Sequence, residues 1–182
     1  AVSGGSTATQ ILGTSRDSLY QPSKWYWCLV DERHVPLDHA DSNFRLLCET
    51  MPPSCKSCPL EYSSDITIMT ESYSSNLSNF CSMIGKSAPD AAFMGMGPDG
   101  HIASLFPGRK WDTDSKGFYM EVFDSPKPLP IRLTLTLDAL KSIPNVLVAA
   151  WGEGKRAAIE GAINEDGKLP VTHIAHAKVF YT

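Results

Sequence analysis

Short apolar runs recur along the chain, and each one ends in glycines or charged residues. Three of them cover residues 25–30, 91–94 and 145–151, and the sequence opens on Ala1-Val2, which has the character of the end of a strand. A continuous apolar run of this length is typical of a strand that is buried on both faces of a parallel sheet. The pattern therefore predicts a parallel sheet whose polar chemistry lies at the strand ends.

The remaining segments have other periods. Residues 131–137 alternate strictly, so Leu133, Leu135 and Leu137 are expected on one face of a strand and Arg132 on the other. This mixture of strands, turns and helices predicts one domain over residues 1–182, an α/β fold with a doubly wound, mostly parallel sheet flanked by helices. Helices are expected after a cap at residues 41–43, over residues 71–84 and from residue 156, and short strands at residues 66–69, 118–123 and 178–181.

Composition narrows the class of protein. Hydrophobic residues make up 42% of the chain, which is enough for an ordinary core and argues against global disorder. The formal net charge of −4 argues against a general surface for nucleic acid or acidic membranes, whereas one local cluster of cations is enough to bind a small anion. No apolar run approaches the ~20 residues that cross a bilayer, and no signal peptide is visible, so a cytoplasmic protein is expected.

The cysteines do not indicate a disulfide framework, because they are five in number and irregularly spaced. Cys55 and Cys58 form a lone CxxC within residues 52–64, a loop rich in proline and serine. One such pair does not complete a tetrahedral zinc site, and a redox pair is expected at a junction between a strand and a helix. We therefore expect ordinary loop thiols, no bound metal and no cofactor.

Two glycine turns have the pattern of anion sites. Residues 3–7 separate Ala1-Val2 from a helix expected over residues 8–12, and residues 152–155 separate a strand from another helix. Free N–H groups at a helix start and the helix dipole attract anions. Lys155 is a cation at a helix start, where the positive end of the helix dipole disfavours it, and a bound anion would relieve this repulsion. The alternatives are a flexible serine-rich chain end and a lysine that points into water.

Titratable groups follow two of the apolar runs. Asp31 and Arg33 come directly after residues 25–30, although a solvated loop with a local ion pair has the same pattern. Residues 95–107 break at glycine and proline and present Asp99 and His101 two positions apart. The alternative for this turn is a loop with a surface histidine, and the alternative for Arg132 is an exposed cation on an edge strand.

Several motifs occur in a fixed order along the chain. They are Ser3-Gly4-Gly5-Ser6-Thr7, Asp31-Glu32-Arg33, Val35-Pro36, Ser42-Asn43, Gly95-Met96-Gly97-Pro98-Asp99-Gly100-His101, Ser125-Pro126-Lys127-Pro128, Arg132-Leu133-Thr134-Leu135-Thr136-Leu137 and Gly152-Glu153-Gly154-Lys155. The set resembles the family of 6-phosphogluconolactonases and glucosamine-6-phosphate deaminases over nearly the whole chain. The deaminase branch follows its Asp-Gly-His-Ile-Ala with Asn-Glu-Pro, whereas here Phe106 stands in the position of the acid. The lactonase branch is therefore favoured.

The resemblance implies a Rossmann-like fold of the sugar-phosphate isomerase and lactonase type. It also implies hydrolysis of 6-phosphoglucono-1,5-lactone to 6-phosphogluconate in the oxidative pentose phosphate pathway. Water attack on this activated ester needs a base and charge stabilisation. His101 is expected as the base, because imidazole titrates near neutral pH, with Asp99 to orient it and the amides of residues 95–100 to bind the oxyanion. The phosphate and sugar are expected on Gly4, Gly5, Ser6, Asp31, Arg33, Arg132 and Lys155.

Two other functions stay open at this point. One is an amino-sugar deaminase and isomerase, and the other is a non-catalytic sugar-phosphate-binding module of a larger fused protein. The second is considered because family members carry a helix and most of a strand before the Ser-Gly-Gly motif and a helix after the final strand, so that this chain is expected to be truncated at both ends. The expected partner is the sugar-phosphate lactone, bound to a monomer without nucleic acid or membrane. Fusion to, or cooperation with, a glucose-6-phosphate dehydrogenase is a further expectation.

Overall fold

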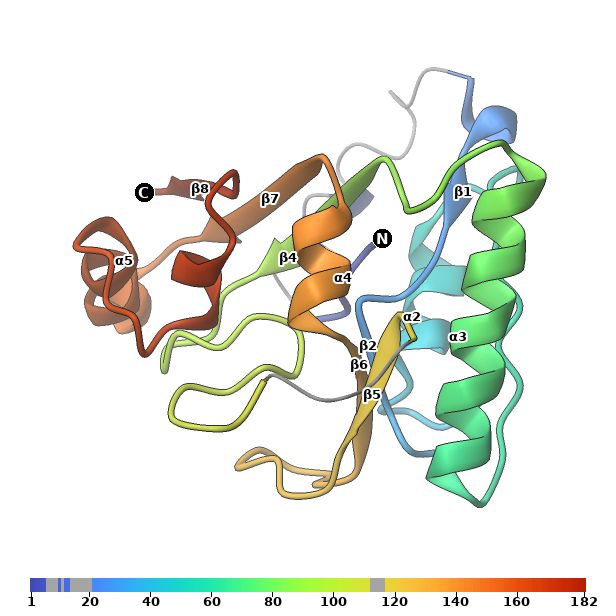
Figure 1. Ribbon diagram of the computed structural model, residues 1–182, viewed down its shortest axis with the longest axis horizontal. Coiled ribbons are helices and arrows are strands. Elements are labelled where there is room, and N and C mark those ends of the chain that lie inside the picture. The colour runs from blue at the N-terminus through green and yellow to red at the C-terminus, as the bar shows by residue number, and fades with distance from the viewer. Residues whose placement is uncertain (6–9, 11, 14–20, 112–116) are drawn as a thin grey trace.

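A parallel sheet forms the centre of the fold (Figure 1), in a computed structural model that describes residues 1–5, 10, 12–13, 21–111 and 117–182. On one side β1 (Tyr26–Trp27) pairs with β3 (Lys56–Ser57), and on the other β4 (Ala91–Gly95), β7 (Asn145–Ala150) and β8 (Lys178–Tyr181) lie side by side. Val2 joins the two halves, because it forms parallel bridges with both Leu29 and Phe93. The strands predicted from the apolar runs are confirmed, although β1 is shorter than the run that contains it.

A second, antiparallel sheet was not predicted. It has the order β2 (Asp31–Arg33), β6 (Arg132–Leu135) and β5 (Tyr119–Val122), and the N–H of Leu135 donates to the carbonyl oxygen of Val30 at 2.8 Å. The interpretation of residues 31–33 as a solvated loop is therefore wrong, because the chain stays extended beyond Val30 and pairs with β6. This pairing carries two charged side chains of β2 into the interior.

Strand β6 is shorter than its alternating pattern suggested. All four of its residues are buried, so the alternation does not separate a core face from an exposed face. Leu137 begins α4 (Leu137–Ser142) instead of ending the strand, because the Thr136 side chain accepts a hydrogen bond from the N–H of Ala139 at 3.0 Å and caps the helix.

The strand predicted at residues 66–69 is wrong. One continuous helix, α3 (Ile66–Met83), covers this segment and most of the helix predicted at residues 71–84. The Asp65 side chain accepts hydrogen bonds from Thr67 and Ile68 at its start, and Met69, Tyr73 and Leu77 bury one face at helical spacing. The cap and this burial outweigh the β-branched residues, which favour a strand only locally.

The other helices and short turns complete the elements. Helix α3 packs on β5 and β6, and α2 packs on β2. No helix in the described part of the chain is long and apolar enough to cross a membrane. The remaining bounds are α2 (Asn43–Thr50), α5 (Arg156–Ile163), and the 3-10 turns η2 (Pro22–Lys24), η3 (Glu153–Lys155) and η4 (Pro170–His173).

Two buried tyrosines hold Leu29 where the chain leaves the parallel sheet. Tyr73 of α3 accepts a hydrogen bond from the N–H of Leu29 at 2.9 Å, and Tyr119 of β5 donates one to the carbonyl oxygen of Leu29. Their rings stack with centroids 4.6 Å apart. Burial raises the pKa of both phenols, so both remain neutral and able to donate. They anchor α3 and β5 to the junction of the two sheets.

The five cysteines are free thiols. Cys58 is a loop thiol, as expected from the sequence, but its side chain is fully buried in the core. Burial, with smaller effects from Cys28 and Cys81, raises its pKa to about 12. A thiol with so high a pKa is unreactive at neutral pH.

The cap of α3 provides a test of the fold. Replacement Asp65→Ala should lower the free energy of unfolding by about 1 kcal/mol, because two N–H groups at the helix start lose their acceptor. Urea unfolding followed by circular dichroism measures this change. Glu61→Ala, an exposed acid in the preceding loop, is the control. Equal losses in the two variants would contradict the assignment of the cap.

Candidate functional site

A pocket of ≈ 260 Å³ opens where strand ends of the two sheets meet. It brings together segments that are far apart in the sequence, and most of the residues predicted for binding line it. Ser6, also predicted, lies outside the described residues, as do Thr7 and most of the helix expected over residues 8–12. The lining residues are Ser3, Gly4, Gly5, Asp31, Arg33, Asn43, Gly95, Met96, Gly97, Pro98, His101, Ala103, Arg132 and Lys155.

His101 and Asp99 are in direct contact, which the sequence could not establish. Nδ1 of His101 lies against Oδ1 of Asp99 within a turn that is closed by a hydrogen bond from the N–H of Gly97 to the carbonyl oxygen of His101 at 2.8 Å. A Cβ at Gly97 would stand 2.2 Å from the imidazole ring, so only glycine permits this approach. The alternative of a plain surface histidine is wrong, since His101 lines the pocket and its side chain is 20% exposed.

The carboxylate of Asp99 determines the tautomer of the imidazole. Burial raises the pKa of Asp99, but its hydrogen bonds to His101 and Lys127 and the charges of both outweigh burial and lower the pKa to about 2. An ionised carboxylate only accepts hydrogen bonds, so the facing Nδ1 carries the proton. The lone pair of the neutral ring is then on Nε2, which is the arrangement that a general base needs.

The ring of Phe106 packs near both a histidine and an arginine. Its centroid is 4.8 Å from that of His101, and the guanidinium carbon of Arg132 lies 5.8 Å from it. Phe106 is buried and its carbonyl oxygen accepts a hydrogen bond from Nε1 of Trp111 at 2.7 Å. The residue that separates the two branches of the resembled family in sequence thus packs against the proposed base.

Two arginines lie opposite each other on neighbouring strands of the antiparallel sheet. Arg33 of β2 and Arg132 of β6 are register partners, and both line the pocket. Arg132 is 5% exposed on the central strand, so the alternative of an exposed edge cation is wrong. Burial lowers its pKa, Asp31 raises it and Arg33 lowers it. Adjacent guanidinium groups in one pocket favour an anionic ligand.

Neutral side chains connect Asp31 to Arg132 and to helix α2. Oγ of Ser104 donates to Oδ2 of Asp31 at 2.7 Å and lies 3.4 Å from Nη1 of Arg132. Nδ2 of Asn43 donates to the backbone oxygen of Asp31 at 2.9 Å. Sequence reasoning assigned no site role to Ser104 or Asn43, because their positions read as a turn residue and as part of a helix cap.

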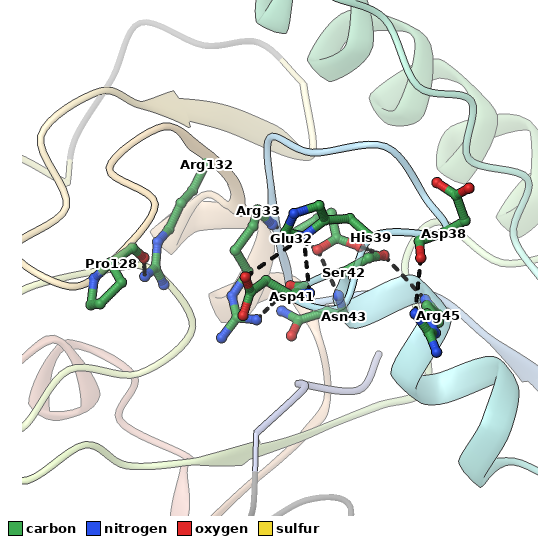
Figure 2. Close-up of polar contacts among 10 residues, drawn as sticks. All are labelled: Glu32, Arg33, Asp38, His39, Asp41, Ser42, Asn43, Arg45, Pro128 and Arg132. Carbon is green, nitrogen blue, oxygen red and sulfur yellow. Dashed lines mark hydrogen bonds and ion pairs between the residues drawn. The ribbon is translucent and has the colours of Figure 1, made fainter.

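A buried carboxylate fixes the strand that carries Asp31 and Arg33. Glu32 accepts hydrogen bonds from the N–H groups of Arg33 and Asn43 at 2.7 Å and from Oγ of Ser42 at 3.0 Å (Figure 2), and from the N–H of Phe44 at 2.6 Å. Burial raises the pKa of Glu32 above its usual value, and these hydrogen bonds offset only part of that effect. Ser42 itself caps α2, as predicted, by accepting from the N–H of Arg45 at 3.1 Å.

Lys155 and the first glycine turn lie on the same pocket. Lys155 immediately precedes α5, as predicted, and burial lowers its pKa. It lines the pocket with Gly4 and Gly5, so the alternative of a lysine that points only into water is wrong. A Cβ at Gly4 would stand 1.9 Å from Oδ1 of Asn43, so this backbone must be glycine. In the described ranges no group of His, Cys, Asp and Glu is arranged to hold a metal ion.

Most of the turn amides expected to bind the oxyanion already donate hydrogen bonds within the protein. The N–H of Gly95 donates to Oγ of Ser3, that of Met96 to the carbonyl oxygen of Ala149, and that of Gly100 to the carbonyl oxygen of Gly97. Together with the N–H of Gly97, these donors already have acceptors within the protein. The cations of the pocket are the better donors to a developing negative charge.

The depressed pKa of Asp99 predicts a pH dependence of stability. Its folded-state pKa of about 2 lies below the ~3.9 of an unfolded chain, so its ionised form stabilises the fold above about pH 4 and that contribution is lost as pH falls toward 2. Between about pH 5 and pH 2 the free energy of unfolding should therefore fall more in the wild type than in Asp99→Asn. The difference should not exceed about 1 kcal/mol, because solvent screens a side chain that is 35% exposed. Parallel curves from urea unfolding at each pH would contradict this expectation.

Comparison with known proteins identifies the family. The model of the family described as glucosamine-6-phosphate isomerases/6-phosphogluconolactonase matches residues 1–181. The chain is 33% identical over 164 residues to 6-phosphogluconolactonase 3, chloroplastic, of Arabidopsis thaliana, covering 81% of this chain and 50% of that protein. It is 32% identical over 160 residues to the 6-phosphogluconolactonase of Rattus norvegicus, covering 84% and 62%.

A solved structure agrees with these sequence matches. The 6-phosphogluconolactonase of Thermotoga maritima superposes with a TM-score of 0.83 at 26% identity, covering 99% of this chain and 82% of that chain. The chain spans about half the length of the plant relative and less than two thirds of the rat relative. These matches in sequence and fold establish that the chain belongs to the glucosamine-6-phosphate isomerase/6-phosphogluconolactonase family.

Proposed function

We propose that the chain hydrolyses 6-phosphoglucono-1,5-lactone to 6-phosphogluconate in the oxidative pentose phosphate pathway. The observation that carries the proposal is the contact of Asp99 with His101 at the edge of a pocket that also holds Arg33, Arg132 and Lys155. A base beside several cations suits water attack on an anionic ester. Relatives named as 6-phosphogluconolactonases support the same reaction.

The reaction begins with a water molecule at the lactone carbonyl carbon. Nε2 of His101 takes a proton from the water as its oxygen bonds to that carbon, and the Asp99 carboxylate stabilises the imidazolium that results. The tetrahedral oxyanion lies near Arg132, whose guanidinium contacts the same phenylalanine ring, that of Phe106, as His101 does. Collapse of this intermediate breaks the bond to the ring oxygen, which receives the proton from His101. One water is consumed and the acid is released.

The substrate phosphate binds at the other end of the pocket. The backbone of Gly4 and Gly5 approaches the ligand there, while Arg33 and Lys155 supply positive charge. Arginine suits two-point contact with phosphate oxygens and lysine acts as a point charge. Asp31, held by Ser104 and Asn43, is suited to accept a hydrogen bond from a sugar hydroxyl.

The alternatives differ in chemistry that can be measured. An amino-sugar deaminase would need an acid where Phe106 packs against His101, and that side chain has no proton to exchange. A non-catalytic binding module would bind 6-phosphogluconate without turning over the lactone. The monomeric state, the cytoplasmic location and cooperation with a glucose-6-phosphate dehydrogenase stay predictions, and some plant relatives are named as chloroplastic.

Removal of the base tests the mechanism. His101→Ala should lower kcat by roughly 10²–10⁴-fold with little change in KM, because the imidazole acts on the attacking water and not on the phosphate. The lactonase assay must subtract spontaneous hydrolysis. His173→Ala, whose imidazole contacts the carbonyl oxygen of Gly167 outside the pocket, is the control. Turnover of His101→Ala near the wild-type value would disprove this role.

Removal of the lysine tests the phosphate end. Lys155→Ala should raise KM by about tenfold, equivalent to ~1.4 kcal/mol, while kcat changes little. Lys141→Ala, at an exposed ion pair with Asp138, is the matched control. An unchanged KM in Lys155→Ala would remove this residue from the phosphate site.

A further inference from the structure

The segment between β5 and β6 forms a closed loop beside the pocket. Oγ of Ser125 accepts a hydrogen bond from the N–H of Lys127 at 3.2 Å, and the N–H of Ser125 donates to the carbonyl oxygen of Pro130 at 3.1 Å. Three prolines at positions 126, 128 and 130 restrict the backbone further. These two hydrogen bonds and the prolines hold the loop in shape without a contribution from the Lys127 side chain.

This loop contacts two residues of the proposed active site, Arg132 and Asp99. The carbonyl oxygens of Pro128 and Leu129 accept hydrogen bonds from Arg132 at 2.8 and 3.0 Å, and Figure 2 includes the contact with Pro128. Nζ of Lys127 forms an ion pair with Oδ2 of Asp99 at 3.1 Å. One short segment thus orients the cation proposed for the oxyanion and contacts the carboxylate that holds the base.

Asp99 lies between two partners as a result. Its Oδ1 faces Nδ1 of His101, and its Oδ2 faces Nζ of Lys127. Lys127 is not among the described residues that line the pocket. Its contact with Asp99 is the route by which it reaches the proposed base.

We propose that Lys127 is a positioning residue for His101, because its ammonium group holds the Asp99 carboxylate ionised and oriented so that His101 keeps its proton on Nδ1 and presents Nε2 as the base. This inference rests on the proposed lactonase function. It extends the pair of His101 and Asp99 to a chain of three groups, of which His101 is the member that lines the pocket. No role for Lys127 follows from its sequence motif alone, since nothing local to residues 125–130 indicates contact with residue 99.

The charge of Lys127 sets the direction of the effect. When the imidazole is protonated, the single negative charge of Asp99 is shared between two positive charges, those of His101 and Lys127. Without Lys127 the carboxylate would favour the imidazolium more strongly, so the base would stay protonated to higher pH. The other charged groups on the pocket, Asp31, Arg33, Arg132 and Lys155, remain in place in such a variant. The side chain of Lys127 is 37% exposed, so added salt should weaken its influence.

The test compares Lys127→Met, Lys127→Arg and the wild type. The acidic limb of the pH profile of kcat should move to higher pH by roughly half a unit or more in Lys127→Met. The plateau of kcat should fall about threefold to tenfold with little change in KM, and Lys127→Arg should restore most of both values. Lys86→Met, which removes an exposed ion pair with Asp90 of similar length, is the control and should behave as the wild type.

A second measurement separates this inference from the lactonase proposal. NMR titration of the His101 ring, assigned by its absence in His101→Gln, should give a midpoint that rises in Lys127→Met and not in Lys86→Met. This readout needs no turnover, so a wild type without lactonase activity would refute the proposed function while the titration still tests the coupling. An unchanged midpoint and pH profile in Lys127→Met, or equal changes in Lys86→Met, would overturn the role of Lys127.

Discussion

The structure depends on one buried carboxylate, that of Glu32, at the junction between the parallel and the antiparallel sheet. A charge with no exposed surface is costly unless its oxygens are fully paired. Here the N–H groups at the start of α2, the hydroxyl of Ser42 and the N–H of Arg33 pair them. The same contacts fix β2 against α2. Asp31 and Arg33, on either side of Glu32, are thereby held at the pocket.

The site is a balance of charges assembled from both sheets. Glycines at positions 4 and 97 bring backbone against Asn43 and His101, where any side chain would collide. Two arginines from the antiparallel sheet and a lysine ahead of α5 face one carboxylate, Asp31, and one histidine with its own carboxylate behind it. The cations exceed the anions on the pocket surface, as a phosphorylated ligand requires.

Local patterns predicted what depends on local chemistry. The apolar runs identified the parallel strands because burial on both faces leaves no polar alternation, and the glycine turn of residues 95–101 identified His101 because its backbone shape is encoded nearby. Strand β2 was missed because the buried pairing of Glu32 comes from α2, ten or more residues away. Ser104 and Lys127 were missed as site residues because their contacts with Asp31 and Asp99 exist only once distant segments have folded together.

One measurement decides whether this chain turns over a sugar-phosphate lactone, as proposed, and not an amino-sugar phosphate. The purified chain is supplied with 6-phosphoglucono-1,5-lactone and, separately, with glucosamine 6-phosphate. We expect acid production from the lactone well above spontaneous hydrolysis, and no ammonia from the amino sugar. Ammonia release, or 6-phosphogluconate binding in calorimetry without any lactone turnover, would contradict the proposal.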